Sequence, residues 1–282
     1  MSSKNKILLR KICAVSLAAA MLAGTGAVAE ISTFIGTNIS VSAAGTTQET
    51  PASSFEYEIN DDGNITITEF TGSETEVVIP SEIDGKSVTK IGHDAFYDCT
   101  SLTSVTIPDS VTSIGSSAFD GCTSLTSITI PDSVTSIGDE AFEYCKSLTS
   151  ITIPDSVTSI GSWAFDGCTS LTSINVSENN DNYSSKDGVL FNKDKTTLIC
   201  CPGGKTGAYT IPGSVTEIGR SAFYGCTSLT SVTIPDSVTE IGGYAFYGCT
   251  SLTSVTIPDS VTTIGECAFY DCTSLTLSLI HI

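Results

Sequence analysis

The stretch TSLTSITIPDSVTSIGDEAFEYC, residues 123–145, decides the fold because it recurs along most of the chain. A period of this length is the signature of a solenoid, in which each copy covers the apolar side of its neighbour. A cysteine closes each copy, and these cysteines are 23 residues apart except at one interruption: Cys99, Cys122, Cys145, Cys168, Cys226, Cys249 and Cys272.

Each copy divides into an extended part and a compact part. The run LTSITIP alternates apolar with polar residues and is rich in β-branched ones, which predicts a short strand that Pro131 ends. The run GDEAFEYC places Phe142 and Cys145 three residues apart, as on one face of a helical turn. We therefore expect a strand, a turn and a short helical or 3₁₀ return in every copy, with the strands in one parallel sheet.

The repeated runs carry a family resemblance. SLTSITIP, SVTSIG and AF..C, repeated through residues 79–276, resemble the BspA-like leucine-rich repeats of bacterial surface and secreted proteins. PDS stands where the usual leucine-rich repeat has asparagine, and this departure belongs to the family. The resemblance implies a β-rich α/β solenoid that binds host or microbial surface macromolecules.

The segment before the repeats has three parts. Residues 1–43 have the basic start and short apolar run of a signal peptide, with cleavage expected after Ala29 or Ala43. Residues 44–54 are a predicted polar linker. Residues 55–78 alternate on both sides of the turn NDDGN, which predicts a hairpin that caps the solenoid.

The interruption between Cys168 and Cys226 is an insertion at about residues 177–208. GVLF and TLIC flank the turn NKDKT, which predicts a second hairpin that projects from one coil or joins the sheet beside it. The insertion holds half of the basic residues expected in the mature chain: Lys186, Lys193, Lys195 and Lys205.

The last six residues, LSLIHI at 277–282, do not continue the repeat. We predict that they are a non-native tail from adapter read-through and that the natural chain continues after Thr276. An anchoring, docking or catalytic domain would then follow the repeats.

The charge of the chain excludes some partners. The net charge is −19, and removal of residues 1–43 leaves 8 basic and 30 acidic residues, or −22. Phosphates and anionic lipid surfaces attract basic proteins, so we expect no nucleic acid and no membrane surface as a partner. No apolar run is long enough to span a membrane. We expect a monomer that is secreted or held at the cell surface.

The sequence offers little chemistry. Its two histidines are His281, in the anomalous tail, and His93, which has no obvious catalytic partner. No phosphate loop, zinc spacing or calcium loop is present, so we predict no catalytic residue, cofactor or metal. A recurring aspartate could line a cation-binding edge, or it could bond within its own turn. Its copies are Asp109, Asp132, Asp155, Asp236 and Asp259.

The cysteines are interpreted as thiols. The seven on the 23-residue ladder occupy a buried apolar position, and free cysteine packs as a small hydrophobe. Coil neighbours point the same way, which is unsuited to the geometry of a disulfide. Cys200, Cys201 and Cys267 lie outside this ladder, and we expect them to be more exposed.

Two surfaces could bind a partner. The outward strand positions are uniform Ser and Thr, which suits either weak binding or plain solvation. The variable turns carry aromatic residues that should align along one flank: Trp163, Tyr224, Tyr244, Tyr247 and Tyr270. Exposed aromatics are enriched at binding hot spots, although tyrosines could also simply cover the flank.

The sequence therefore predicts an exported, non-catalytic recognition or adhesion protein that binds an extracellular protein or glycan through its solenoid. One alternative is the repeat region of a larger secreted or multienzyme-complex protein. Another is a passive spacer.

Overall fold

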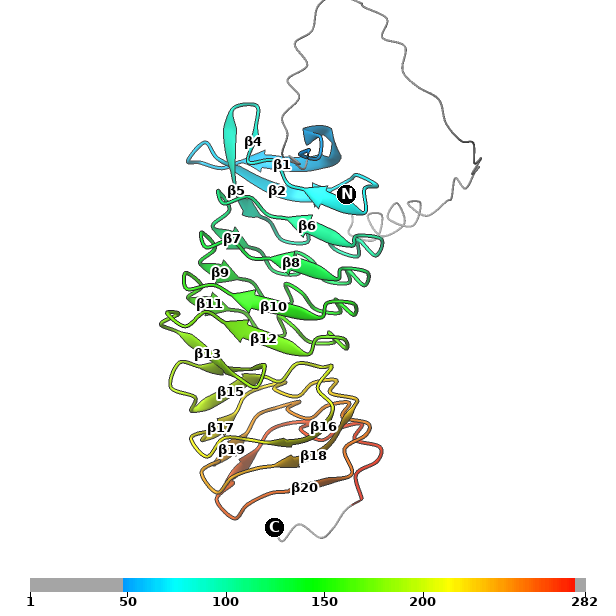
Figure 1. Cartoon of the computed structure of the whole chain (residues 1–282), viewed down its shortest axis with the longest axis vertical. Coiled ribbons are helices and arrows are strands. Elements are labelled where there is room, and N and C mark those ends of the chain that lie inside the picture. Colours follow the sequence, from blue (N-terminus) through cyan, green and yellow to red (C-terminus); the bar gives the residue numbers. More distant parts are fainter. Residues whose placement is uncertain (1–47, 277–282) are drawn as a thin grey trace, which may run out of the picture. The chain divides into compact units, whose positions relative to one another are not determined.

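The computed structural model describes residues 48–276 (Figure 1). The chain divides into two units, Met1–Thr46 and Thr47–Ile282, and the described residues belong to the second. The predicted signal peptide and the predicted non-native tail lie outside the described residues.

The described unit is a solenoid whose coils stack through two rows of mostly parallel strands (Figure 1), and the strand pairing divides these rows into five sheets. The predicted strand recurs before the insertion as β3 (Glu76–Val78), β6 (Ser104–Thr106), β8 (Ser127–Thr129), β10 (Ser150–Ile153) and β12 (Ser173–Val176). After the insertion it continues as β16 (Gly207–Thr210), β18 (Leu229–Thr233) and β20 (Ser254–Thr256). Equivalent residues pair directly, as Val105 does with Ile128, so every inward position forms a column along the solenoid.

The prediction of a single sheet was wrong, because the SVTSIG run forms a second one. Its first half contains β5 (Lys86–Ile91), β7 (Ser113–Ile114), β9 (Ser136–Ile137) and β11 (Ser159–Ile160). Its second half contains β17 (Glu217–Ile218), β19 (Glu240–Ile241) and β21 (Thr263–Ile264). A two-residue strand shows too little alternation to be identified from one copy.

Both predicted hairpins are present and extend the second sheet. At the N-terminal end, β1 (Phe55–Ile59) pairs antiparallel with β2 (Ile65–Phe70), and β2 runs parallel to β5. A short β4 (Glu82–Ile83) pairs antiparallel with β5. In the insertion, β13 (Tyr183–Lys186), β14 (Val189–Asn192) and β15 (Thr197–Cys200) form an antiparallel meander. Because β15 also runs parallel to β17, the insertion joins the sheet.

The residues before β1 are packed against the solenoid. Thr50 donates its amide to the Val78 carbonyl at 2.9 Å, and its hydroxyl accepts from the Val78 amide at the same distance. A single 3₁₀ turn, η3 (Ala52–Ser54), leads into β1. This end of the predicted linker is therefore part of the folded unit.

The returns are successive turns and not the predicted short helical or 3₁₀ segments, since the one 3₁₀ helix among the described residues is Ala52–Ser54. The Glu143 amide donates to the Glu140 carbonyl at 3.0 Å, three residues back. Glu140 has φ 58°, a left-handed conformation that ends any helical run. Other return amides donate across coils, so no α-helix forms among residues 48–276.

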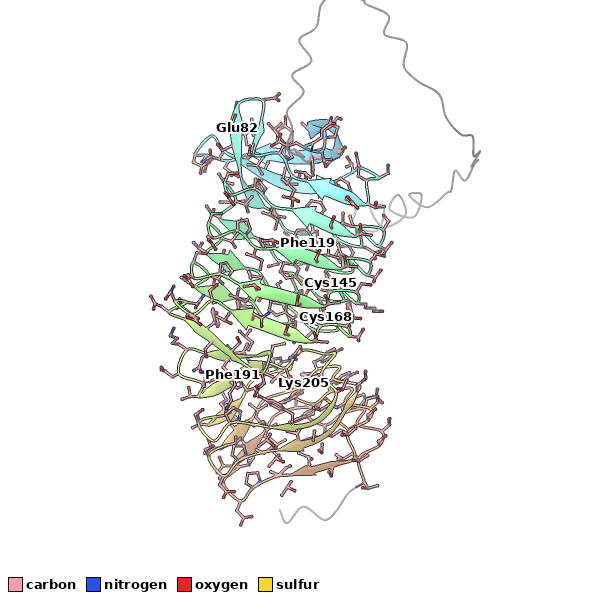
Figure 2. All side chains as sticks on the ribbon, in the orientation of Figure 1. Glu82, Phe119, Cys145, Cys168, Phe191 and Lys205 are labelled. Carbon is pink, nitrogen blue, oxygen red and sulfur yellow. The ribbon has the colours of Figure 1, made fainter. Side chains whose placement is uncertain are left out.

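Aromatic and sulfur columns fill the core beneath these turns. Figure 2 labels Phe119, Cys145 and Cys168 within consecutive coils. Phe119 and Phe142 are fully buried, and their rings stack at 5.4 Å. The Cys145 thiol donates to the Phe119 carbonyl at 3.2 Å. The ladder cysteines are therefore free thiols that cap a carbonyl of the preceding coil, which a purely apolar residue would leave without this partner.

Hydroxyl groups add a second set of bonds between coils. Ser133 Oγ donates to the Val111 carbonyl at 2.6 Å, and Ser110, Ser156, Ser237 and Ser260 repeat this contact. The serine next to each recurring aspartate thus holds the turn, whereas the local bond had been expected from the aspartate.

Candidate binding surface

Aromatic side chains gather on one flank of the solenoid, and we call this set the aromatic flank: Tyr144, Trp163, Tyr224, Tyr244, Tyr247 and Tyr270. All six lie on the returns, where the fold needs no particular side chain. The rings of Tyr224 and Tyr247 stack at 5.0 Å, and those of Tyr247 and Tyr270 at 5.2 Å. The 23-residue period sets this spacing, because each coil places its ring directly over the previous one.

Trp163 is connected to the same flank across the insertion by Ser221 and Arg220. Its Nε1 donates to Ser221 Oγ at 3.0 Å, although 58 residues separate the two in sequence. Arg220 lies between the two halves, with its guanidinium carbon 5.6 Å from the Trp163 ring and 4.8 Å from the Tyr244 ring. It also pairs with Glu266 at 3.2 Å. Trp163 is 38% exposed and Tyr270 is 60% exposed, so the flank presents ring surface to solvent at both ends.

The sequence prediction missed two members of this region. Arg220 is a variable turn residue whose role depends on the insertion bringing two distant coils together. Tyr144 occupies a different column from the other tyrosines, yet it approaches Tyr224. Burial and a hydrogen bond that the Tyr224 hydroxyl donates to Tyr144 raise the pKa of Tyr224. Neither role can be read from the residue's own copy of the repeat, because both depend on contacts with a distant coil.

The tyrosine column becomes a carboxylate column in the earlier coils. Burial, together with neighbouring carboxylates, raises the pKa of Asp120 to about 6, of Glu143 to about 7 and of Asp166 to about 8. Carboxyl oxygens of Asp120, Glu140 and Glu143 lie within 4.8 Å of one another. Among the described residues, these three are the group whose spacing could hold a cation. The recurring aspartates of the PDS turns form no such group in the described region.

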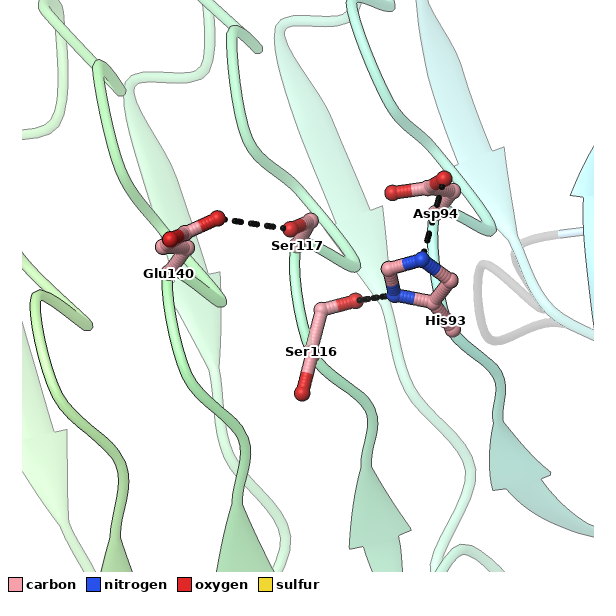
Figure 3. A network of polar contacts seen from close by, with 5 residues as sticks. All are labelled: His93, Asp94, Ser116, Ser117 and Glu140. Atoms are coloured by element: carbon pink, nitrogen blue, oxygen red, sulfur yellow. Dashed lines mark hydrogen bonds and ion pairs between the residues drawn. The ribbon is translucent and has the colours of Figure 1, made fainter. Parts of the chain in front are cut away.

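His93, the histidine of the described region, lies near serine and acidic side chains (Figure 3). Its Nδ1 contacts the Ser116 carbonyl at 3.0 Å, and its Nε2 lies 3.3 Å from Asp94 Oδ2. The nearby hydroxyl of Ser117 donates to Glu140 at 3.2 Å. The Ser117 hydroxyl is therefore bonded to a carboxylate and not to the imidazole.

The three thiols outside the ladder differ from one another in exposure. Cys267 is exposed, as expected, and has φ 51°. Cys201 is 2% exposed and packs in the core of the second half, so its predicted exposure was wrong. Cys200 is half-buried. Both lie where the chain leaves the insertion and returns to the core.

Parallel strands, leucine and phenylalanine columns and a 23-residue coil define a leucine-rich-repeat solenoid. The chain belongs to the BspA type leucine-rich repeat family, whose model matches residues 73–197 and 203–280. No curated protein matches the chain.

Three solved structures are similar over most of this chain. A leucine-rich repeat protein from Eubacterium ventriosum is 32% identical, with 80% of this chain and 69% of that chain covered and a TM-score of 0.63. The leucine-rich repeat protein of T. pallidum is 35% identical, with coverages of 81% and 91% and a TM-score of 0.51. The pneumococcal vaccine antigen PcpA is 29% identical, with coverages of 79% and 59% and a TM-score of 0.66. Within residues 48–276, no helix has the length and apolar character to cross a membrane.

Proposed function

We propose that this chain is an exported, non-catalytic recognition protein that binds extracellular proteins or glycans through the aromatic flank. The observation that carries the proposal is the stack of Tyr224, Tyr247 and Tyr270, with Arg220 between the Trp163 and Tyr244 rings on the same flank. Aromatic and arginine side chains supply most of the energy at binding hot spots. Similarity to a vaccine antigen supports a location at the cell surface.

Charge on the same flank restricts the partner. The carboxylate column precedes the tyrosine column, and the chain is strongly acidic. Polyanions such as nucleic acid are therefore repelled. A neutral or basic extracellular macromolecule fits both columns.

The test measures binding of the secreted chain to arrayed glycans and to immobilised extracellular glycoproteins. We expect saturable binding that falls at least tenfold when Tyr224, Tyr247 and Tyr270 are all replaced by alanine. Tyr97→Ala is the matched control, because Tyr97 occupies the same column in the first coil and is 46% exposed. Binding that survives the triple substitution would rule out this surface, and no saturable binding would rule out recognition by the described region.

A further inference from the structure

The insertion opens the solenoid next to Trp163, and the opening leaves a cavity of about 190 Å³. We call it the seam pocket. The return of one coil lines one side, from Ile160 to Asp166. Leu190, Thr197 and Ile199 of the insertion line the other side, and Arg220 lies at the following coil. Neither sheet runs through this point, because β11 pairs only with β9 among the described strands.

The opening interrupts a regular hydrogen-bond ladder. In the preceding coil, the amides of Glu140, Phe142 and Tyr144 donate to carbonyls of the next coil at 2.8, 2.9 and 2.8 Å. One coil later the equivalent amides belong to Trp163, Phe165 and Gly167. Within residues 48–276 these three amides donate to no protein acceptor. An amide that is buried without a partner costs about 1–3 kcal/mol.

An acceptor is unpaired at the same place. The carbonyls of Ile114 and Ile137 each accept from the glycine amide of the next coil, at 2.9 Å in both cases. The carbonyl of Ile160 has no such donor in the described region, because the amide of Gly219 bonds to Leu198 instead, at 2.9 Å. The seam pocket therefore has both donors and an acceptor that the protein itself does not satisfy.

The charges around the pocket are already compensated. Burial and the neighbouring Glu143 raise the pKa of Asp166 to about 8, so this carboxyl is protonated at neutral pH and can both donate and accept. Arg220 pairs with Glu266 and lies against two aromatic rings. A neutral ligand with many hydroxyl groups suits this environment better than an ion.

From these features we propose that the seam pocket binds one neutral sugar residue, such as the end unit of a glycan. The Trp163 indole would cover the C–H face of the ring, while the amides of Trp163 and Phe165 and the carbonyl of Ile160 bond its hydroxyls. The cavity is comparable in size with a single hexose ring and is too small for an extended peptide of several residues. This inference rests on the proposed function, because it names the class of macromolecule that the flank binds.

Trp163 is the single tryptophan of the chain and lines the pocket, so tryptophan fluorescence comes from this part of the molecule. The experiment titrates the full chain with the methyl glycosides of glucose, galactose, mannose and N-acetylglucosamine. We expect a saturable change in Trp163 fluorescence with at least one of them. Saturation-transfer NMR on the same samples would show which ring protons touch the protein.

Two variants locate the site. Thr197→Phe fills the pocket from β15, and we expect it to abolish the fluorescence change. Thr263→Phe is the matched control, because the pairings β15·β17, β17·β19 and β19·β21 place Thr263 in the same column without a pocket. Sugar binding in NMR that Thr197→Phe leaves intact would place the sugar elsewhere and overturn the inference.

The outcomes separate this inference from the proposed function. No response to any glycoside, while the tyrosine-dependent binding to glycoproteins persists, would overturn the pocket alone. A pocket response to trialanine but not to sugars would replace the sugar with a peptide and equally overturn it. A sugar response without any binding that depends on the tyrosines would overturn only the proposed function of the flank.

Discussion

Phe142 offers the sharpest test of how the solenoid is stabilised. Its side chain is fully buried and lies between two stacked neighbours, with ring centroids 5.4 Å from Phe119 and 5.8 Å from Phe165. Truncation to alanine removes the buried ring and leaves a cavity, which costs about 3–5 kcal/mol for a core phenylalanine. The two stacked pairs contribute about 0.5–1.5 kcal/mol each to that total.

The matched control is Phe269→Ala in the last described coil. Phe269 occupies the same column, but it is half-buried and stacks on Phe246 alone, at 5.0 Å. Half of the burial implies a loss of roughly 1 kcal/mol. Comparing the two substitutions therefore separates the contribution of position from that of residue type.

The assay is unfolding in guanidinium chloride, followed by circular dichroism and by Trp163 fluorescence. Solenoid stability is a sum over coils and their interfaces. The loss of stability in Phe142→Ala should therefore lower the denaturant midpoint seen by both probes, because the coil of Phe142 contacts the coil of Trp163. A loss below about 1 kcal/mol at Phe142, typical of a surface substitution, would refute its assignment to the core column.

Three further predictions concern pH, glycine and thiols. Burial raises the folded-state pKa of Glu143 to about 7 and of Asp166 to about 8. The contribution of these two carboxyl groups to the free energy of unfolding is fully present below their unfolded-state pKa values. It is lost as the pH rises through their folded-state values of about 7 and about 8. Thermal melting should thus fall between pH 5 and 9, and Asp166→Asn should flatten the fall. Gly138→Ala should lower the melting temperature, because its Cβ would lie 2.6 Å from the carbonyl carbon of Gly115, whereas Gly213→Ala, with open space around it, should not. Among the cysteines of residues 48–276, a thiol reagent should label Cys267 first, and rapid labelling of the buried ladder would contradict the packing.

The repeat period was enough to predict most of the fold. A cysteine, a phenylalanine and a leucine at fixed spacing can share one environment only if the copies stack. The second sheet was missed because Ser136–Ile137 is too short to show alternation. The alignment of Tyr224, Tyr247 and Tyr270 could be predicted from the repeat period, since equivalent residues of successive coils align. The position of Arg220 could not be predicted, because it depends on where the insertion returns the chain.

The seam pocket also depends on the insertion, which no single copy of the repeat reveals. A continuous solenoid satisfies the amide of each return with the next coil and leaves no room for a ligand. Inserting β13–β15 separates two coils on one side, while Trp163 Nε1 still bonds to the buried Ser221.

The repeated contacts that hold the coils together do not use the side chains of the aromatic flank, so these side chains are free to bind a partner. Backbone ladders, serine hydroxyls and cysteine thiols bond each coil to the next, and phenylalanine fills the interior. None of these contacts needs the residue after the core phenylalanine, which is Asp120 in one coil and Tyr247 in another. This column can therefore change from carboxylate to aromatic at little cost to the fold. Because neighbouring copies lie about 5 Å apart, as the stacked tyrosines show, a change in one coil alters a continuous surface. Differences in what such solenoids bind should accordingly concentrate in this column and at insertions that interrupt it.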